Sequence, residues 1–234
     1  MQIEMKICVF SDIHGNGPAF FAALGDILSE KADVHVFLGD LCGYYYDQLS
    51  IYSRLRDIPD LVSLKGNHDE LFLRIYGGDE DVRQDYRHRY GNSMERLLQA
   101  DCREMADWLA GLPVSLAWDD LGTLFCHGSP GEPLAGYIYP DTPLEALAEE
   151  AASTIVLGNT HYPMHRKIAG KAIVNPGSLG QPRHGGWSSY AVLDLAVGEV
   201  AFREVRYDLS PLYAQIDDFR ENNSYLKRVL SRCT

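Results

Sequence analysis

Apolar and polar positions alternate with two different spacings in the first quarter of this chain. Short apolar runs occupy residues 6–10, 34–38 and 61–65, and each has the length of a buried strand. Residues 18–30 carry apolar side chains at helical spacing, and residues 47–56 predict a second, shorter helix. Because strands alternate with helices, we expect an α/β fold whose sheet is parallel in this half of the chain.

The spacing changes twice further along the chain. A helical stretch rich in Arg, Tyr and Asp covers roughly residues 70–112, and we interpret it as an insertion beside the sheet within one domain of residues 1–234. Strand spacing returns after Pro113. The remaining expected elements are strands at 114–118, 121–126, 154–157, on both sides of Gly170, 189–195 and 199–205, a helix near 143–152, and a helical C-terminal tail.

Polar side chains follow the ends of five predicted strands. They are Asp12 with His14, Asp40 after Gly39, Asn67 with His68 and Asp69 after Gly66, His127 before Gly128, and Asn159 with His161 after Gly158. Sites in open α/β sheets form beyond the carboxyl ends of the strands, and a glycine lets the backbone turn sharply there. A single Asp-x-His pair is more often an ordinary turn. Five strand ends that carry only oxygen and imidazole groups together predict a metal site.

Charge and cysteine content narrow the classes of function. The chain is 46% hydrophobic with a formal net charge of −12, so it repels nucleic-acid backbones and anionic lipid. We expect no membrane partner, because no apolar run is long enough to span a bilayer. Five irregularly spaced cysteines and no Cys-x-x-Cys pair predict free thiols and a cytoplasmic location. Glu4 and Lys6 interrupt the first apolar stretch, so we expect no signal peptide.

The order of the polar blocks resembles that of the calcineurin-like metallophosphoesterases. The blocks are Asp-x-His, Gly-Asp, Gly-Asn-His-Asp, His-Gly and Gly-x-x-His, and the resemblance extends from residue 6 to about residue 205. The phrase Asn-Pro-Gly-Ser-Leu-Gly-Gln-Pro-Arg at residues 175–183 resembles the small bacterial phosphodiesterase branch. The resemblance implies a four-layer α/β/β/α sandwich, two metal ions in a cleft, and hydrolysis of phosphate esters.

The resemblance also implies a set of metal ligands. These are Asp12, His14, Asp40 and His161 for the first ion, and Asp40, Asn67, His127 and Asn159 for the second. Asp40 is the candidate bridge, since one carboxylate can bind two ions. Asn159 stands where the family usually has a histidine, so its coordination stays open. Mixed imidazole and oxygen ligands suit transition metals, with Mn as the first expectation and Fe, Zn, Ni or Co as alternatives.

The third block contains the catalytic candidate. His68 resembles the family's histidine that does not bind metal, which implies that it protonates the leaving oxygen or stabilises the transferring phosphoryl group. The nucleophile would be a water activated by the two metals. No arginine follows Asp40 closely, and the block ends in Asp69 rather than Glu. Both departures place the chain outside the protein Ser/Thr phosphatases and the symmetric diadenosine tetraphosphate hydrolases.

Other candidate residues have weaker support. Arg183 and His184 lie in a loop that could reach a substrate, and Tyr44 could stack on a nucleobase. Cys126 beside His127 permits a thiol nucleophile as a minor alternative. The remaining histidines are interpreted as core or surface residues: His35, His88 and His165.

Together these observations predict a metal-dependent hydrolase. Its substrate would be a small phosphodiester, a nucleotide or a dinucleoside polyphosphate. The main alternative is a non-catalytic protein-binding scaffold on the same fold, as in a retromer subunit that resembles this family but lacks the catalytic histidine. The presence of His68 favours the enzyme. A nuclease acting on polymeric nucleic acid is disfavoured by the net charge of −12.

Overall fold

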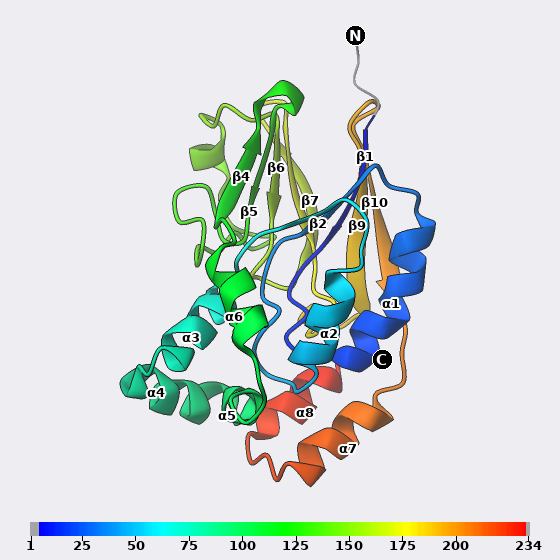
Figure 1. The fold of residues 1–234 in the computed structure, drawn as a ribbon. Helices are drawn as coiled ribbons and strands as arrows, with labels where there is room; N and C mark the ends of the chain where they lie inside the picture. Colours follow the sequence, from blue (N-terminus) through cyan, green and yellow to red (C-terminus); the bar gives the residue numbers. More distant parts are fainter. Residues whose placement is uncertain (1–4, 233–234) are drawn as a thin grey trace.

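Two five-stranded sheets pack face to face at the centre of the molecule (Figure 1). The computed structural model describes residues 5–232, so Glu4 and Cys233, which entered the sequence analysis, lie outside the described residues. The strand orders are β10-β9-β1-β2-β3 in one sheet and β4-β5-β6-β8-β7 in the other. Helices flank this pair of sheets, and the α/β fold class is confirmed.

The first sheet is parallel where the sequence predicted it to be. β1 (Lys6–Phe10), β2 (Val34–Phe37) and β3 (Leu61–Ser63) run in the same direction. β9 (Ser188–Asp194) pairs antiparallel with β1, and β10 (Glu199–Val205) pairs antiparallel with β9. Because parallel strands end at the same edge, the segments that follow β1, β2 and β3 meet there.

The second sheet is mixed. Its strands are β4 (Ser115–Trp118), β5 (Thr123–Cys126), β6 (Thr154–Leu157), β7 (Pro163–Ile168) and β8 (Lys171–Pro176). β5, β6 and β8 are parallel, while β4 and β7 pair antiparallel at the two edges. The turn between β4 and β5 is the 3-10 segment Asp119–Leu121, closed by Gly122 with a φ of 55°.

The alternation of side chains along β1 defines two apolar layers. Ile7 and Val9 lie between the sheets with Phe125 of the second sheet, whereas Cys8 and Phe10 belong to the core under the helices. Successive residues of a strand point to opposite faces, so one strand serves both layers. The first sheet is therefore covered by the second sheet on one face and by helices on the other.

Eight helices occur among residues 5–232. They are α1 (Gly17–Ser29), α2 (Gln48–Leu55), α3 (Asn67–Tyr76), α4 (Glu80–Tyr90), α5 (Ser93–Leu97), α6 (Arg103–Ala110), α7 (Ser210–Asp218) and α8 (Ser224–Leu230). Helix α3 begins at Asn67, three residues before the predicted boundary, because the Asp69 carboxylate accepts a hydrogen bond from the Gly66 N–H at 3.0 Å. None of these helices combines the length and apolar character that a bilayer crossing requires.

The predicted helix near residues 143–152 is wrong. The segment forms a single 3-10 turn, Glu145–Leu147. The Lys171 ammonium donates hydrogen bonds to the carbonyl oxygens of Glu150 and Ala152, at 2.6 and 3.2 Å. Both carbonyls lie in the last turn of the predicted helix and would be free there as well, so this contact does not exclude a helix. The segment is short, and one isolated turn gains too few hydrogen bonds to propagate.

Candidate metal centre

The polar blocks after β1, β2, β5 and β6 converge at one edge of the two sheets. Ligand atoms of Asp12, His14 and His161 lie within 4.8 Å of one another, and so do those of Asp12, Asp40 and His127. All five side chains are buried, with exposed fractions of 0–2%. The structure thus brings five of the residues nominated from the sequence into one cluster.

The Nε2 atoms of the three histidines point into this cluster. His14 Nε2 lies 3.2 Å from His161 Nε2 and 3.6 Å from Asp40 Oδ2. His161 Nε2 lies 3.2 Å from Asp12 Oδ1, and His127 Nε2 lies 3.3 Å from Asp40 Oδ2. Asp40 Oδ2 therefore lies between two imidazoles that come from different sheets.

A backbone carbonyl holds each imidazole from behind. The Nδ1 atoms of His14, His127 and His161 lie 2.9, 2.9 and 2.7 Å from the carbonyl oxygens of Cys42, Leu38 and Gln181. Because a carbonyl oxygen only accepts hydrogen bonds, each Nδ1 carries a ring proton, and Nε2 of the neutral ring has the lone pair. This arrangement orients metal-binding histidines in proteins.

Two carboxylate oxygens in the cluster have no hydrogen-bond donor among the described residues. They are Asp12 Oδ1 and Asp40 Oδ2, and both are buried. The other oxygen of each carboxylate does accept a backbone N–H, from Asn159 at 3.2 Å and from His68 at 2.8 Å. A buried acceptor without a donor costs about 1–3 kcal/mol, and the cost is larger when the acceptor is charged. Where the facing imidazoles are neutral, the lone pairs of Nε2 atoms point toward those of carboxylate oxygens, and a bound cation would relieve their repulsion.

Burial and charge set the protonation of the cluster. Burial lowers the pKa of His14 and of His161, which keeps both imidazoles neutral. At His127 the Asp40 carboxylate outweighs burial and raises the pKa to about 9. Burial opposes ionisation of Asp12 and Asp40, yet the pKa of both carboxyl groups is lowered, and the charge on His127 contributes to this at both. A proton on His127 Nε2 would face Asp40 Oδ2 at 3.3 Å, and a bound metal would take the place of that proton.

The two asparagines nominated as ligands adjoin the cluster. Asn67 Oδ1 lies 3.0 Å from His127 Nε2. The side-chain Nδ2 of Asn159 donates a hydrogen bond to the Gly136 carbonyl at 3.0 Å, which leaves Oδ1 as the atom that can coordinate. The Asn159 φ of 64° is left-handed, a conformation that asparagine tolerates well. Coordination and turn formation are therefore both compatible with this residue.

The loops that carry the cluster have strained backbones. Five of the nominated ligands have positive φ values of 51–64°: Asp12, His14, Asp40, Asn159 and His161. Such a conformation costs about 1–3 kcal/mol per residue and persists where the surroundings fix it. The surroundings here include Gly66, where an added Cβ would lie 2.1 Å from Asp40 Oδ1. The loops thus approach one another too closely for a larger residue.

His68 lies beside the cluster without joining either ligand group. Its ring centroid is 4.9 Å from that of His14 and 4.9 Å from that of Tyr44. His68 Nδ1 lies 3.1 Å from the Tyr86 hydroxyl, so Nε2 is the nitrogen left for a substrate. Burial lowers the pKa of His68 to about 4, which makes the ring neutral at pH 7.

Arg183 and Tyr44 meet at the border of the cluster. The Arg183 Nη2 donates hydrogen bonds to the Tyr44 hydroxyl at 3.1 Å and to Gln181 Oε1 at 3.2 Å. The Tyr44 ring packs edge-on against His14, with 4.6 Å between centroids, and is only 3% exposed. Tyr44 therefore lines the cluster and offers little open ring surface.

Asp69 positions the backbone of the site, a role that the sequence analysis did not assign to it. Its carboxylate accepts hydrogen bonds from the backbone N–H groups of Asp40, Cys42 and Gly66, at 2.8, 2.9 and 3.0 Å. It thereby fixes the loop that carries Asp40. Burial raises the pKa of Asp69 to about 7. One indication of this structural role was present in the sequence, the position of Asp69 two residues after the proposed ligand Asn67.

The remaining histidines and Cys126 do not contribute to the cluster. His35 is buried in β2 and its Nδ1 bonds the Pro59 carbonyl at 2.9 Å, as a core histidine should. Neither ligand group found among the described residues includes His88, His165 or His184. Cys126 is buried, and burial raises the pKa of its thiol to about 12, which does not favour a thiol nucleophile.

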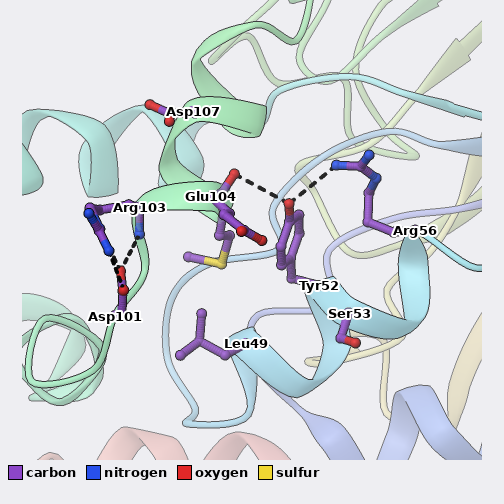
Figure 2. Close-up of a pocket in the computed structure, with 9 residues that line it drawn as sticks. Leu49, Tyr52, Ser53, Arg56, Asp101, Arg103, Glu104 and Asp107 are labelled. Atoms are coloured by element: carbon purple, nitrogen blue, oxygen red, sulfur yellow. Dashed lines mark hydrogen bonds and ion pairs between the residues drawn. The ribbon is translucent and has the colours of Figure 1, made fainter.

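A separate cavity of about 820 Å³ lies between α2 and α6 (Figure 2). Arg56 Nη1 donates to the Tyr52 hydroxyl at 3.2 Å, and that hydroxyl donates to the Glu104 carbonyl at 3.3 Å. No histidine and none of the clustered carboxylates line this cavity. It is therefore distinct from the candidate metal centre.

The chain is similar to known proteins over most of its length. A family model described as the calcineurin-like phosphoesterase superfamily domain matches residues 5–198. The crystal structure of a metallophosphoesterase from Sphaerobacter thermophilus is 26% identical, with a TM-score of 0.79 and coverage of 97% of this chain and 99% of that one. The uncharacterized protein MJ0912 of Methanocaldococcus jannaschii is 28% identical over 235 residues, 92% of this chain and 93% of that protein. The hypothetical protein PH1004 from Pyrococcus horikoshii OT3 shares the fold, with 22% identity, a TM-score of 0.81 and coverage of 96% and 97%.

Proposed function

Because this chain belongs to the calcineurin-like phosphoesterase superfamily, we propose that it hydrolyses small phosphate esters with two divalent transition-metal ions. The observation that carries the proposal is the convergence of three imidazole Nε2 atoms on two buried carboxylate oxygens that lack donors. The substrate would be a small phosphodiester, a nucleotide or a dinucleoside polyphosphate. Manganese is the first expectation for the metal.

The proposed ligands divide between the two ions. Asp12, His14 and His161 would hold the first, Asn67, His127 and Asn159 the second, and Asp40 would bridge them. The bridge is supported by Asp40 Oδ2, which lies 3.6 Å from His14 Nε2 and 3.3 Å from His127 Nε2. Bound metals would supply an activated water and neutralise charge on the phosphoryl oxygens.

Two further side chains would act on the substrate directly. His68 would act on the leaving oxygen through Nε2, since Nδ1 lies 3.1 Å from the Tyr86 hydroxyl. Burial lowers the pKa of His68 to about 4, so the ring would take up a second proton when the anionic substrate binds and would pass that proton to the leaving oxygen. Arg183 would bind a phosphoryl oxygen through its Nε, which is buried and has no partner among the described residues. Tyr44 would position the guanidinium through its bond to Nη2.

A panel of substrates and metals tests the proposed function. The panel contains p-nitrophenyl phosphate, bis(p-nitrophenyl) phosphate and diadenosine tetraphosphate, each assayed with Mn, Ni, Co, Zn and Mg. We expect hydrolysis of at least one class with Mn and less with Mg, because Mg accepts imidazole ligands poorly. Wild-type protein that binds metal but hydrolyses nothing in the panel would favour the scaffold alternative instead.

Replacement of Asn159 by histidine should tighten the second metal equivalent. An imidazole is a stronger donor to transition metals than an amide oxygen, so Zn should gain more than Mn. Calorimetric titration of metal into metal-free wild type and Asn159→His measures both equivalents. The first equivalent should be unchanged, since its proposed ligands are untouched. Identical isotherms for both proteins would mean that residue 159 does not face the metals.

A further inference from the structure

Two exposed tyrosines lie side by side in the loop that follows His127. Tyr137 is 49% exposed and Tyr139 is 37% exposed. Their ring centroids are 5.8 Å apart, and the ring planes are inclined by only 5°. The two rings are thus stacked parallel to each other as an ordered aromatic pair, and the part of each ring that its neighbour does not cover is open to solvent.

Contacts on both sides join this tyrosine pair to the candidate metal centre. Gly136, the residue before Tyr137, accepts the hydrogen bond from Asn159 Nδ2 at 3.0 Å. The Tyr139 ring packs edge-on against Tyr162, with 6.0 Å between centroids, and Tyr162 directly follows a histidine of the cluster. The tyrosine pair therefore lies next to the loops that carry the proposed ligands.

The loop that carries the pair is held in place by hydrogen bonds. The Tyr139 N–H donates to Thr142 Oγ1 at 2.8 Å, and the Thr142 N–H donates to the Tyr139 carbonyl at 3.0 Å. Arg166 of β7 donates from Nη1 to the Thr142 carbonyl at 2.6 Å. A surface fixed before binding loses little conformational entropy when a ligand arrives.

The Arg183 charge reaches both the tyrosine pair and the ligand cluster. Burial raises the pKa of Tyr137, and the Arg183 charge opposes that rise. The pKa of Arg183 is raised in turn by Tyr44, Asp12 and Tyr139 against the effect of burial. One cation, whose buried Nε has no partner among residues 5–232, thus lies within electrostatic range of the metal centre and of the tyrosine pair.

We propose that Tyr137 and Tyr139 form a platform on which the nucleobase of a nucleotide substrate stacks, while Arg183 binds the phosphate beside the metal centre. The proposal rests on the proposed function, because the same centre would receive the phosphate. Stacking on tyrosine accepts every base, since each base has a π-face. The platform would therefore select nucleotides over aliphatic phosphate esters without selecting among bases.

The size of the platform favours a small ligand. A tyrosine side chain buries about 150–250 Å² when fully covered, and these two rings are only partly exposed. A stable protein interface needs about 800 Å² from each partner. Two half-exposed rings match the area of a base and fall well short of a protein interface.

Binding of two phosphate ligands to the Mn-loaded protein tests the platform. The ligands are adenosine 5′-monophosphate and ribose 5-phosphate, which differ only in the base, and calorimetry measures both affinities. We expect wild type to bind the nucleotide about 5–150-fold more tightly, which is the range for one stacked base. The double variant Tyr137→Ala/Tyr139→Ala should lose this preference and keep its affinity for ribose 5-phosphate.

Three variants separate stacking from other effects. Tyr137→Phe/Tyr139→Phe should retain the preference, because both rings remain. Tyr76→Ala removes a tyrosine of similar exposure, 41%, at the far end of α3 and should change nothing. Arg183→Gln should weaken both ligands by the same factor, because both carry the phosphate.

Two outcomes would overturn the platform. One is equal affinity of wild type for the two ligands, and the other is a base preference that survives in the double alanine variant. Because calorimetry measures binding alone, the proposed function is judged separately. A protein that prefers the nucleotide but hydrolyses no ester keeps the platform and refutes the function. A protein that hydrolyses esters without any base preference keeps the proposed function and refutes the platform.

Discussion

Treatment with excess chelator should abolish phosphate-ester hydrolysis and lower the melting temperature, and Mn should restore both. Metal that binds only the folded state stabilises it by about 2.7 kcal/mol at a hundred times its dissociation constant. For a chain of this size, that free energy corresponds to about 5–10 °C. Thermal melts followed by circular dichroism, with chelator and with Mn, measure the shift independently of activity.

The control for this prediction is Asp40→Asn. The amide can keep the hydrogen bond that Asp40 Oδ1 accepts from the His68 N–H at 2.8 Å, but it removes the charge between His14 and His127. Its melting temperature should respond to Mn far less than that of wild type, and its hydrolysis should be lost with every metal. Full wild-type activity after long incubation with chelator would contradict the metal mechanism.

The first sheet was predictable from the sequence because its signals are local. Apolar runs of strand length alternate with helical spacing, and this alternation alone gave β1, β2 and β3 as parallel strands. The failure at residues 143–152 concerns a segment that is too short to be stable as a helix by itself. The Lys171 ammonium binds the carbonyls of Glu150 and Ala152, and no spacing within that segment announces such a contact. Contacts outside such a segment decide its conformation, so its spacing alone could not.

The candidate site was predictable where its residues directly follow strands in the sequence. Polar blocks at strand ends nominated the clustered residues because parallel strands deliver their carboxyl ends to one edge. The tyrosine pair had no comparable signal. Tyr137 and Tyr139 lie in an irregular loop, and their place beside the centre depends on the Gly136–Asn159 hydrogen bond and the Tyr162 ring. Such contacts join segments whose separation in the sequence is more than 20 residues, so spacing could not find them.

Replacement of His68 by alanine should lower kcat by about 10²–10⁴ and leave metal binding intact. A positioned proton donor contributes a factor of this size. His68 lies outside both ligand groups, although its ring centroid is 4.9 Å from that of His14. Metal content of the purified variant and steady-state kinetics measure the two effects separately. Loss of metal from the purified variant would instead indicate that His68 is a metal ligand.

The leaving group distinguishes between the two roles considered for His68. A nitrophenolate leaves without protonation, whereas an alkoxide needs a proton, so a proton donor matters more for the alkyl ester. The loss in His68→Ala should therefore shrink for nitrophenyl substrates. Tyr86→Phe keeps the imidazole but removes the hydroxyl that bonds Nδ1 at 3.1 Å, so its loss should be smaller, with the same dependence on leaving group. An equal loss for both leaving groups would assign His68 to stabilising the phosphoryl group, because that interaction does not depend on the proton demand of the departing oxygen.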